Sequence, residues 1–212
     1  MFKKKPFFIV FEGVEGCGKS YQSQRLKKNL KKKGINSLLT REPGGTKSAE
    51  LIRTLILKDY FNTKTEEKFN KYTDTLLYLA ARNEHVTNII KPALNEKKIV
   101  ICDRFTDSTL AYQVYGKKVN KSFIDHIHKF IIKGIKPNIT FILKVSSKSS
   151  KLRLKKRKIK NRYDKFSQSF YTRAQKSFLK IAKNKKNYFV LNSSSNNNDL
   201  EKKIFEIVYK RL

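Results

Sequence analysis

The sequence has few of the features that mark secreted, membrane-bound or multidomain proteins. Two cysteines, Cys17 and Cys102, are too few for a disulfide framework and predict a protein of the reducing cytoplasm. The longest apolar run near either end, Phe7–Phe11, is far shorter than a signal-peptide core or a membrane span. No linker rich in Pro, Gly or Ser divides the chain. We therefore expect a single domain over residues 1–212 with no membrane partner.

Acidic residues are also scarce, since 17 Asp and Glu stand against 49 Lys and Arg and give a formal net charge of +32. Such an excess points toward nucleic acid, but 39 of these cations are Lys, only ten are Arg, and the lysines are spread along the whole chain. Lys, Asn, Ile and Phe have codons rich in A and T, so a biased base composition also explains the excess. A hydrophobic content of 39% excludes a disordered polycation. We expect no specific nucleic-acid partner.

Five short runs of apolar, β-branched or aromatic residues predict β-strands with helical segments between them. The runs are nearly continuously apolar, which is typical of strands buried on both faces of a parallel sheet. This alternation predicts an α/β sandwich with right-handed crossovers, whose ligands bind at the carboxyl ends of the strands. The predicted strands are Pro6–Glu12, Ile35–Thr40, Ile99–Asp103, Asn138–Val145 and Tyr188–Asn192. The predicted helices are Lys19–Lys33, Ala49–Lys58, Glu67–Asn95, Ser122–Lys133, Phe166–Lys183 and Asp199–Arg211.

The first predicted strand runs directly into a segment, GVEGCGKS, that matches G-x-x-x-x-G-K-[ST] at every fixed position. Its glycines let backbone N–H groups converge on phosphate oxygens, and the following helix presents its positive N-terminus to the same anion. Lys19 is expected to bridge the β- and γ-phosphates, and the Ser20 hydroxyl suits a Mg²⁺ ion that retains waters. We therefore expect a nucleoside triphosphate and Mg²⁺. The predicted loop residues are Gly13, Val14, Glu15, Gly16, Cys17, Gly18, Lys19 and Ser20.

Charged residues follow the next two predicted strands. The second strand ends in TREPGGT, residues 40–46, and the third in DRFTDSTLAYQ, residues 103–113. Asp103 closes an apolar strand, where a carboxylate is expected to hold the hydration shell of Mg²⁺. The alternative interpretation of Asp103 is a helix cap with an exposed charge.

These motifs together resemble those of the thymidylate kinases, which phosphorylate dTMP to dTDP. The resemblance covers nearly the whole chain and rests on FEGVEGCGKS, TREPGGT, the segment LYLAAR at residues 77–82 and DRFTDSTLAYQ. It implies a P-loop three-layer sandwich with a five-stranded parallel sheet, helices on both faces and a short basic lid. It also implies ATP as the phosphoryl donor, Mg²⁺ and a homodimer. Another P-loop nucleotide or deoxynucleoside kinase and a basic P-loop nucleic-acid-binding protein stay open as alternatives.

Several residues are candidates for binding the thymine base and the sugar. Tyr78 and Arg82 share one helix face, so a ring can stack on the base while the guanidinium beside it reaches the base edge. The Gln113 amide matches the N3–H and O4 of thymine. The resemblance implies that Tyr112 crowds the sugar against a 2′-hydroxyl. Two further hydroxyl residues either cap the helix carrying Tyr112 or line the base pocket: Ser108 and Thr109.

For the acceptor phosphate, the resemblance points to Arg53 and Arg104, whose forked guanidinium groups suit an anion. The alternative for Arg53 is an ordinary surface charge on a helix. The resemblance also implies that Glu42 lies near that phosphate and the metal-water network, and that Glu15 contacts the 3′-hydroxyl of the nucleotide.

The basic segment KLRLKKRKIKNR, residues 151–162, falls within a predicted lid of about residues 148–164. Phosphoryl transfer needs positive charge on the transferring group, and the resemblance implies an arginine from either the P-loop or the lid. Because Gly16 and not Arg precedes Cys17, we expect the lid to supply it, from Arg157 before Arg153. The strand residue Lys144 departs from the family, which usually has an acid there. The three histidines show no metal-binding spacing and receive no role.

Overall fold

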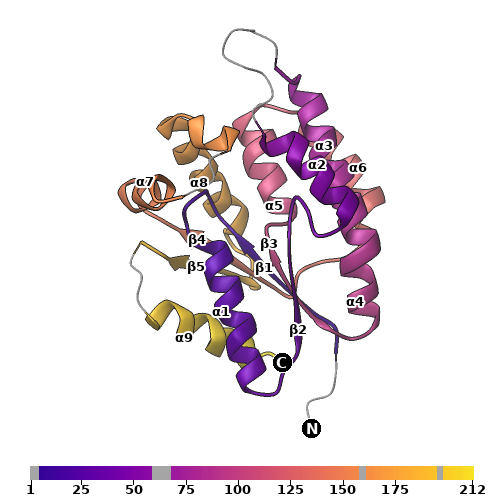
Figure 1. The fold of residues 1–212 in the computed structure, drawn as a ribbon, viewed down its shortest axis with the longest axis vertical. Coiled ribbons are helices and arrows are strands. Elements are labelled where there is room, and N and C mark those ends of the chain that lie inside the picture. The colour runs from indigo at the N-terminus through magenta and orange to yellow at the C-terminus, as the bar shows by residue number, and fades with distance from the viewer. Residues whose placement is uncertain (1–4, 59–67, 158–160, 195–197) are drawn as a thin grey trace.

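Five parallel strands form the centre of the molecule (Figure 1). The computed structural model describes residues 5–58, 68–157, 161–194 and 198–212. The spatial order of the strands is β2-β3-β1-β4-β5, and every neighbouring pair is parallel. The strands are β1 (Phe7–Glu12), β2 (Ser37–Arg41), β3 (Ile99–Asp103), β4 (Ile139–Lys144) and β5 (Tyr188–Asn192). The predicted α/β fold with a five-stranded parallel sheet is confirmed.

Helical segments connect the strands and cover both faces of the sheet (Figure 1). No helix among the described residues is long and apolar enough to cross a membrane. The α-helices are α1 (Lys19–Lys32), α2 (Lys47–Leu57), α3 (Lys71–His85), α4 (Lys91–Asn95), α5 (Thr106–Thr109), α6 (Lys121–Ile132), α7 (Ser147–Lys155), α8 (Gln168–Ala182) and α9 (Asn198–Tyr209). Two π-helical segments, η1 (Val86–Ile90) and η2 (Leu110–Gly116), and the 3₁₀ turn η3 (Arg162–Lys165) complete the described structure.

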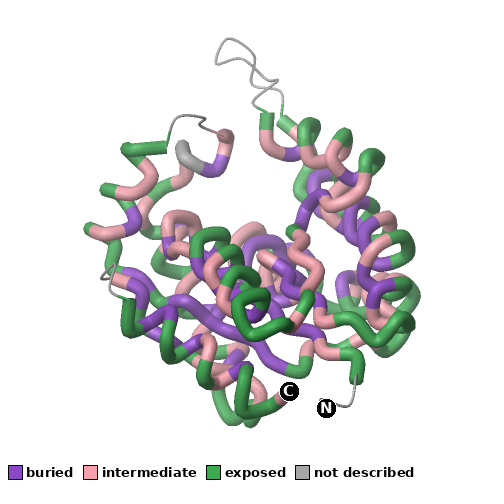
Figure 2. The backbone as a smooth tube through the Cα atoms, turned by 60° about the horizontal axis from the view of Figure 1, so that its bottom comes forward, coloured by how far each residue is buried: buried purple, intermediate pink, exposed green. Residues whose placement is uncertain are grey.

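Alternate side chains of β1 pack in two different core clusters, one on each face of the sheet. Ile9 and Phe11 pack in one cluster with Leu26 of α1, whereas Phe8 and Val10 pack in another with Ile90 of η1. This division follows from the two-residue period of a strand, which points successive side chains to opposite faces. Figure 2 shows the buried residues along the strands and on the inward sides of the helices. The sheet is thus covered on both faces, as the continuous apolar runs predict.

The segment predicted as one helix over Glu67–Asn95 differs in detail. Residue 67 lies outside the described residues, and α3 begins only at Lys71, because the Asn70 side chain caps it by accepting from the Tyr72 N–H at 2.8 Å. The helical path then passes through η1 into α4. Pro92 has no N–H for the carbonyl of residue 88, so the regular i→i−4 pattern cannot continue there. Residues 158–160 of the predicted lid also lie outside the described residues.

Candidate active site

The glycine-rich loop joins β1 to α1 in the conformation that a phosphate-binding loop needs. Gly13 and Gly16 have positive φ angles of 139° and 70°. A Cβ at Gly13 would lie 2.7 Å from the carbonyl oxygen of Leu143, so only glycine fits there. The buried Lys19 ammonium donates to the carbonyl oxygens of Gly13 at 3.1 Å and Val14 at 2.9 Å. The loop therefore encloses its lysine at the point where we expect phosphate to bind.

Ser20 and Asp103 meet beside this loop, at the carboxyl ends of the adjacent strands β1 and β3. The Ser20 hydroxyl donates to Oδ2 of Asp103 at 2.5 Å. Oδ1 of the same carboxylate is buried and has no hydrogen-bond partner among the described residues. Hard oxygen ligands with unused lone pairs are what Mg²⁺ and its bound waters require. The pair fits a magnesium site, although the described residues contain no cluster of three His, Cys, Asp or Glu side chains that could hold a metal.

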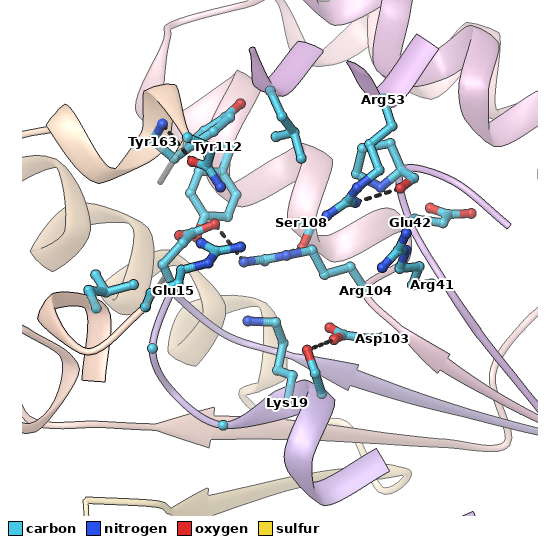
Figure 3. Close-up of a pocket in the computed structure, with 18 of the residues that line it drawn as sticks. Glu15, Lys19, Arg41, Glu42, Arg53, Asp103, Arg104, Ser108, Tyr112 and Tyr163 are labelled. Atoms are coloured by element: carbon cyan, nitrogen blue, oxygen red, sulfur yellow. Dashed lines mark hydrogen bonds and ion pairs between the residues drawn. The ribbon is translucent and has the colours of Figure 1, made fainter. Parts of the chain in front are cut away.

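Arg104 occupies the centre of the pocket (Figure 3). Its guanidinium donates to the Gly13 carbonyl oxygen at 2.9 Å and forms an ion pair with Glu15 at 2.7 Å. Tyr112 donates to the other oxygen of Glu15 at 2.5 Å. Burial alone would raise the pKa of Glu15, but the charges of Arg104 and Lys19 hold it below the ordinary value. Glu15 is therefore an anion that orients both Arg104 and Tyr112.

Glu12, which the sequence interpretation overlooked, binds the residues that follow Arg104. Arg104 has a φ of 75°, an unusual backbone conformation for a residue with a side chain. The fully buried Glu12 carboxylate accepts from the backbone N–H of Phe105 at 2.8 Å and from the hydroxyl of Ser108 at 2.6 Å. Burial and the neighbouring charge of Asp107 raise the pKa of Glu12 to about 8. The only sequence signal was an acid at the end of an apolar strand, immediately before the glycine loop.

Two further arginines approach the same space from the other side (Figure 3). Arg53 is half-buried rather than a freely exposed helix charge, and it donates to the Pro43 carbonyl oxygen at 2.6 Å. Arg41, which was not predicted, forms a 3.0 Å ion pair with Glu50. Burial first, and then the charge of Arg41, lower the pKa of Arg53. This concentration of positive charge suits an anionic group in the pocket.

Arg82 is almost fully buried and is held by a polar network. It forms a 2.7 Å ion pair with Glu42 and donates to the hydroxyl of Thr109 at 2.7 Å. Two histidines complete the network: Nδ1 of His85 lies 3.1 Å from Glu42, and Nε2 of His128 lies 2.8 Å from Arg82. Burial would raise the pKa of Glu42, but Arg82 and His85 lower it below the ordinary value. Neither histidine could be assigned a role from sequence, because their partners lie on other elements.

Aromatic side chains form the opposite end of the pocket, together with one amide. Tyr78 and Tyr112 both line it, as expected, and Tyr163 is an additional wall that was predicted only as the end of the lid. The Tyr112 and Tyr163 rings meet edge to face with centroids 5.8 Å apart. Gln113 is 2% exposed, and its Nε2 is buried without a hydrogen-bond partner among the described residues. A buried amide donor of this kind is positioned for a ligand acceptor.

Helix α7 brings the start of the basic segment against the glycine-rich loop. Ser150 donates to the Glu15 carbonyl oxygen at 2.8 Å, and Arg153 donates to the carbonyl oxygens of Gly16 at 3.1 Å and Ser193 at 2.7 Å. Arg157 is exposed and lines the same pocket. The structure therefore places Arg153 against the glycine-rich loop and both candidate lid arginines in the lining of the pocket.

One cavity of about 490 Å³ is lined by residues of the glycine-rich loop, the arginines, the aromatic wall and Gln113. Gly13, Val14 and Cys17 of the predicted site lie in the loop behind it, and the other predicted residues line it. These are Glu15, Gly16, Gly18, Lys19, Ser20, Glu42, Arg53, Tyr78, Arg82, Asp103, Arg104, Ser108, Thr109, Tyr112, Gln113, Arg153 and Arg157. Ser108 and Thr109 both line the pocket, whereas neither α5 nor η2, the segment that carries Tyr112, has a side-chain cap hydrogen bond at its start.

Comparison with known proteins agrees with this geometry. Residues 11–204 match the family described as Thymidylate kinase. The chain is 38% identical over 199 residues to the thymidylate kinase of Geotalea daltonii, covering 91% of each chain. It is 40% identical over 210 residues to that of Wolbachia pipientis subsp. Culex pipiens, covering 96% of each. The crystal structure of thymidylate kinase from Ehrlichia chaffeensis superposes with a TM-score of 0.75 at 34% identity, covering 96% of this chain and 99% of that one.

Proposed function

The chain belongs to the thymidylate kinase family, and we propose that in this pocket it transfers the γ-phosphoryl group of ATP in line to the 5′-phosphate of dTMP, forming dTDP. One observation carries the proposal: the pocket has a triphosphate loop at one end, a cluster of arginines in the middle and an aromatic wall with an unpaired amide at the other. This order matches a donor phosphate chain, an acceptor phosphate and a base. We place the reaction in one domain, residues 1–212, with a lid of about residues 148–164.

At the donor end, Lys19 and the loop N–H groups neutralise the phosphates of ATP. Ser20 and Asp103 would hold Mg²⁺, which supplies charge neutralisation at the donor phosphates when bound. The unpaired Oδ1 of Asp103 supports this assignment. A lid arginine adds the remaining charge, with Arg157 ahead of Arg153. Arg153 donates to the carbonyl oxygens of Gly16 and Ser193, and both lid arginines line the pocket.

At the acceptor phosphate, Arg53 and Arg104 provide forked donors. This phosphate is already anionic, so the reaction needs no strong general base. Positioning and charge neutralisation then supply most of the acceleration. Glu42 contributes by holding Arg82 and by its place beside the acceptor phosphate.

At the base, the unpaired Nε2 of Gln113 is the natural donor to O4 of thymine, while its amide oxygen accepts from N3–H. Cytosine lacks the N3 donor and would leave a buried group unpaired, at a cost of about 1–3 kcal/mol. Tyr78 stacks on the ring and Arg82 reaches its edge. Tyr112 and Glu15 lie where the sugar passes, with Glu15 as the acceptor for the 3′-hydroxyl.

We also propose that two copies of the chain associate through helices α2, α3 and α6. These helices are neighbours and carry exposed apolar side chains, including Leu51 at 72% and Phe130 at 65% exposure (Figure 1). Apolar side chains that are left exposed on packed helices suit an interface. Sedimentation of the wild-type chain and of Leu51→Glu measures the association of the two copies, and a monomeric wild type contradicts it.

We also propose that the enzyme is located in the cytoplasm.

A coupled ADP-release assay tests the reaction with dTMP, dUMP, CMP, AMP and thymidine as acceptors. We expect turnover to be fastest with dTMP. Lys19→Ala is expected to abolish it while circular dichroism shows a folded protein, because the variant lacks the positive charge that binds the transferring phosphate. Turnover of Lys19→Ala near the wild-type rate contradicts the loop assignment. Preference for another acceptor contradicts the base assignment.

A further inference from the structure

One buried acid on the base-binding helix has no part in the proposed reaction. Asp74, Tyr78 and Arg82 follow one another at four-residue intervals, so they share one face of α3. Tyr78 and Arg82 line the pocket, but Asp74 does not. Asp74 is only 1% exposed. A carboxylate removed from water in this way is costly unless cations compensate for it.

Two cations from different parts of the chain provide that compensation. Lys117, which follows η2, donates to Oδ2 of Asp74 at 2.6 Å. Arg162, the first residue of η3, forms an ion pair with Oδ1. Asp74 therefore ties α3 to two segments that are distant in sequence. Arg162 is followed directly by a wall residue of the pocket, whereas Lys117 lies four residues beyond Gln113, after the end of η2.

The wall residue that follows Arg162 is Tyr163. It is 4% exposed, and its hydroxyl is hydrogen-bonded to the hydroxyl of Tyr78 across the base end of the pocket. Its ring contacts Tyr112 edge to face (Figure 3). The guanidinium of Arg162 lies 5.5 Å from the centre of the same ring. Arg162 thus contacts both Asp74 and the Tyr163 ring.

We propose that Asp74 is a positioning residue that, by anchoring Arg162, holds Tyr163 against Tyr78 and sets the width of the base-binding end of the pocket. This inference rests on the proposed function, because it takes the aromatic end of the pocket as the site of a pyrimidine. The ligand class follows from the aromatic lining, because flat rings stack on aromatic side chains. Asp74 acts on dTMP only through Arg162 and Tyr163.

Asp74→Asn and Arg162→Met each remove the charge of one partner of the Asp74–Arg162 ion pair. Each is expected to raise the KM for dTMP about tenfold, equivalent to about 1.4 kcal/mol, while kcat and the KM for ATP change little. Lys117→Met removes the other partner of the same carboxylate and leaves the pair with Arg162 intact. It is expected to leave the KM for dTMP near the wild-type value.

The comparison between Arg162→Met and Lys117→Met separates positioning from stability. If Asp74 only stabilises the fold, both variants lower the melting temperature and neither changes the KM for dTMP selectively, and this result overturns the proposal. Asp125→Asn, which breaks the exposed pair with Lys121, is the matched control for loss of an acid. Arg162→Lys keeps a cation for Asp74 and is expected to retain more dTMP affinity than Arg162→Met, so the proposal is tested even if Asp74→Asn does not fold.

Failure of this inference and failure of the proposed function give different results. A wild-type enzyme that does not phosphorylate dTMP contradicts the function. A wild type that does so, with an Arg162→Met variant of unchanged KM for dTMP, contradicts only the positioning role of Asp74.

Discussion

His128 holds Arg82 from the side opposite Glu42. Its Nε2 accepts a hydrogen bond from Arg82 at 2.8 Å, and the ring lies on α6 whereas Arg82 lies on α3. Burial and then the adjacent guanidinium lower the pKa of His128 to about 3, so the imidazole is neutral at physiological pH and remains an acceptor. The direction of the Arg82 guanidinium in the base pocket thus depends on two helices.

His128→Leu should weaken dTMP binding. It leaves a buried guanidinium N–H without a partner, at a cost of about 1–3 kcal/mol, and we expect the KM for dTMP to rise by about tenfold. His128→Asn restores an acceptor and should lose less. His126→Leu is the control, because His126 is exposed on the same helix. Steady-state kinetics in dTMP and ATP measure the effect, and equal behaviour of the two Leu variants contradicts it.

Glu12 should make folding stability fall with pH above neutrality. Its pKa is about 8 in the folded protein against an ordinary 4.5, so its contribution is complete below pH 4.5 and is lost as the pH rises to about 8. The contribution of His128 to folding stability changes in the opposite direction and rises with pH between about pH 3 and 6.5, because its imidazole binds a proton more readily in the unfolded chain. The two offset each other between pH 4.5 and 6.5. Above pH 6.5 the loss from Glu12 remains, about 2 kcal/mol by pH 8.

Urea unfolding at pH 6.5, 7.0, 7.5 and 8.0 measures this loss. Glu12→Gln keeps the size of the side chain and an acceptor for the Phe105 N–H but cannot ionise, so its stability should be nearly constant over that range. If the variant loses stability with pH as the wild type does, Glu12 is not the source.

Gln113→Ala should reduce the selectivity for thymine. The variant loses both the donor and the acceptor that face the base, so the KM for dTMP should rise while the KM for ATP stays near its wild-type value. Discrimination against CMP should fall by about 1–3 kcal/mol in kcat/KM. Competition between dTMP and CMP in one assay measures the ratio directly. An unchanged nucleotide preference would show that another group reads the base.

Gly16→Ala should impair the use of ATP. A Cβ at Gly16 would lie 2.8 Å from the carbonyl oxygen of Ser150, so α7 must move away from the glycine-rich loop and take Arg153 with it. We expect kcat/KM for ATP to fall by at least about tenfold, which corresponds to about 1.4 kcal/mol.

Gly34→Ala is the matched control for this strain. Gly34 has a similar φ of 73°, but nothing lies within 4 Å of the position of its Cβ. Both variants carry the backbone cost of about 1–2 kcal/mol, but only Gly16→Ala has the clash. Equal loss of activity in the two variants would refute the role of the contact between Gly16 and Ser150.

The contiguous motifs and strands could be predicted from the sequence because their signals are local. Each predicted strand overlaps an observed one, and the residues expected at strand ends line one pocket because parallel strands end on the same edge. The short helix α5 and the π segments η1 and η2 were not separately predicted. Their form depends on contacts such as that of Glu12 with the Phe105 N–H, which joins residues 93 positions apart.

Residues that act through partners from other elements were beyond sequence reasoning. His128, Glu12 and Tyr163 acquire their positions only when α3, α6, β1 and η3 converge, and none has a motif spacing that marks it. The histidines illustrate this difficulty: a search for metal-binding spacing dismissed them, whereas His85 and His128 serve as hydrogen-bond partners of Glu42 and Arg82.

The central position of β1 sets the order in which the enzyme is built during synthesis. Its two neighbours are β3, which ends at Asp103, and β4, which ends at Lys144. After β1 leaves the ribosome, it can pair with β3 only when residue 103 has emerged and with β4 only when residue 144 has emerged. Such long-range pairing is slow and leaves apolar strands uncovered meanwhile. The nucleotide-binding loop is thus synthesised before the strands that flank β1, so ATP can stabilise it in this sheet only after residue 144 has emerged.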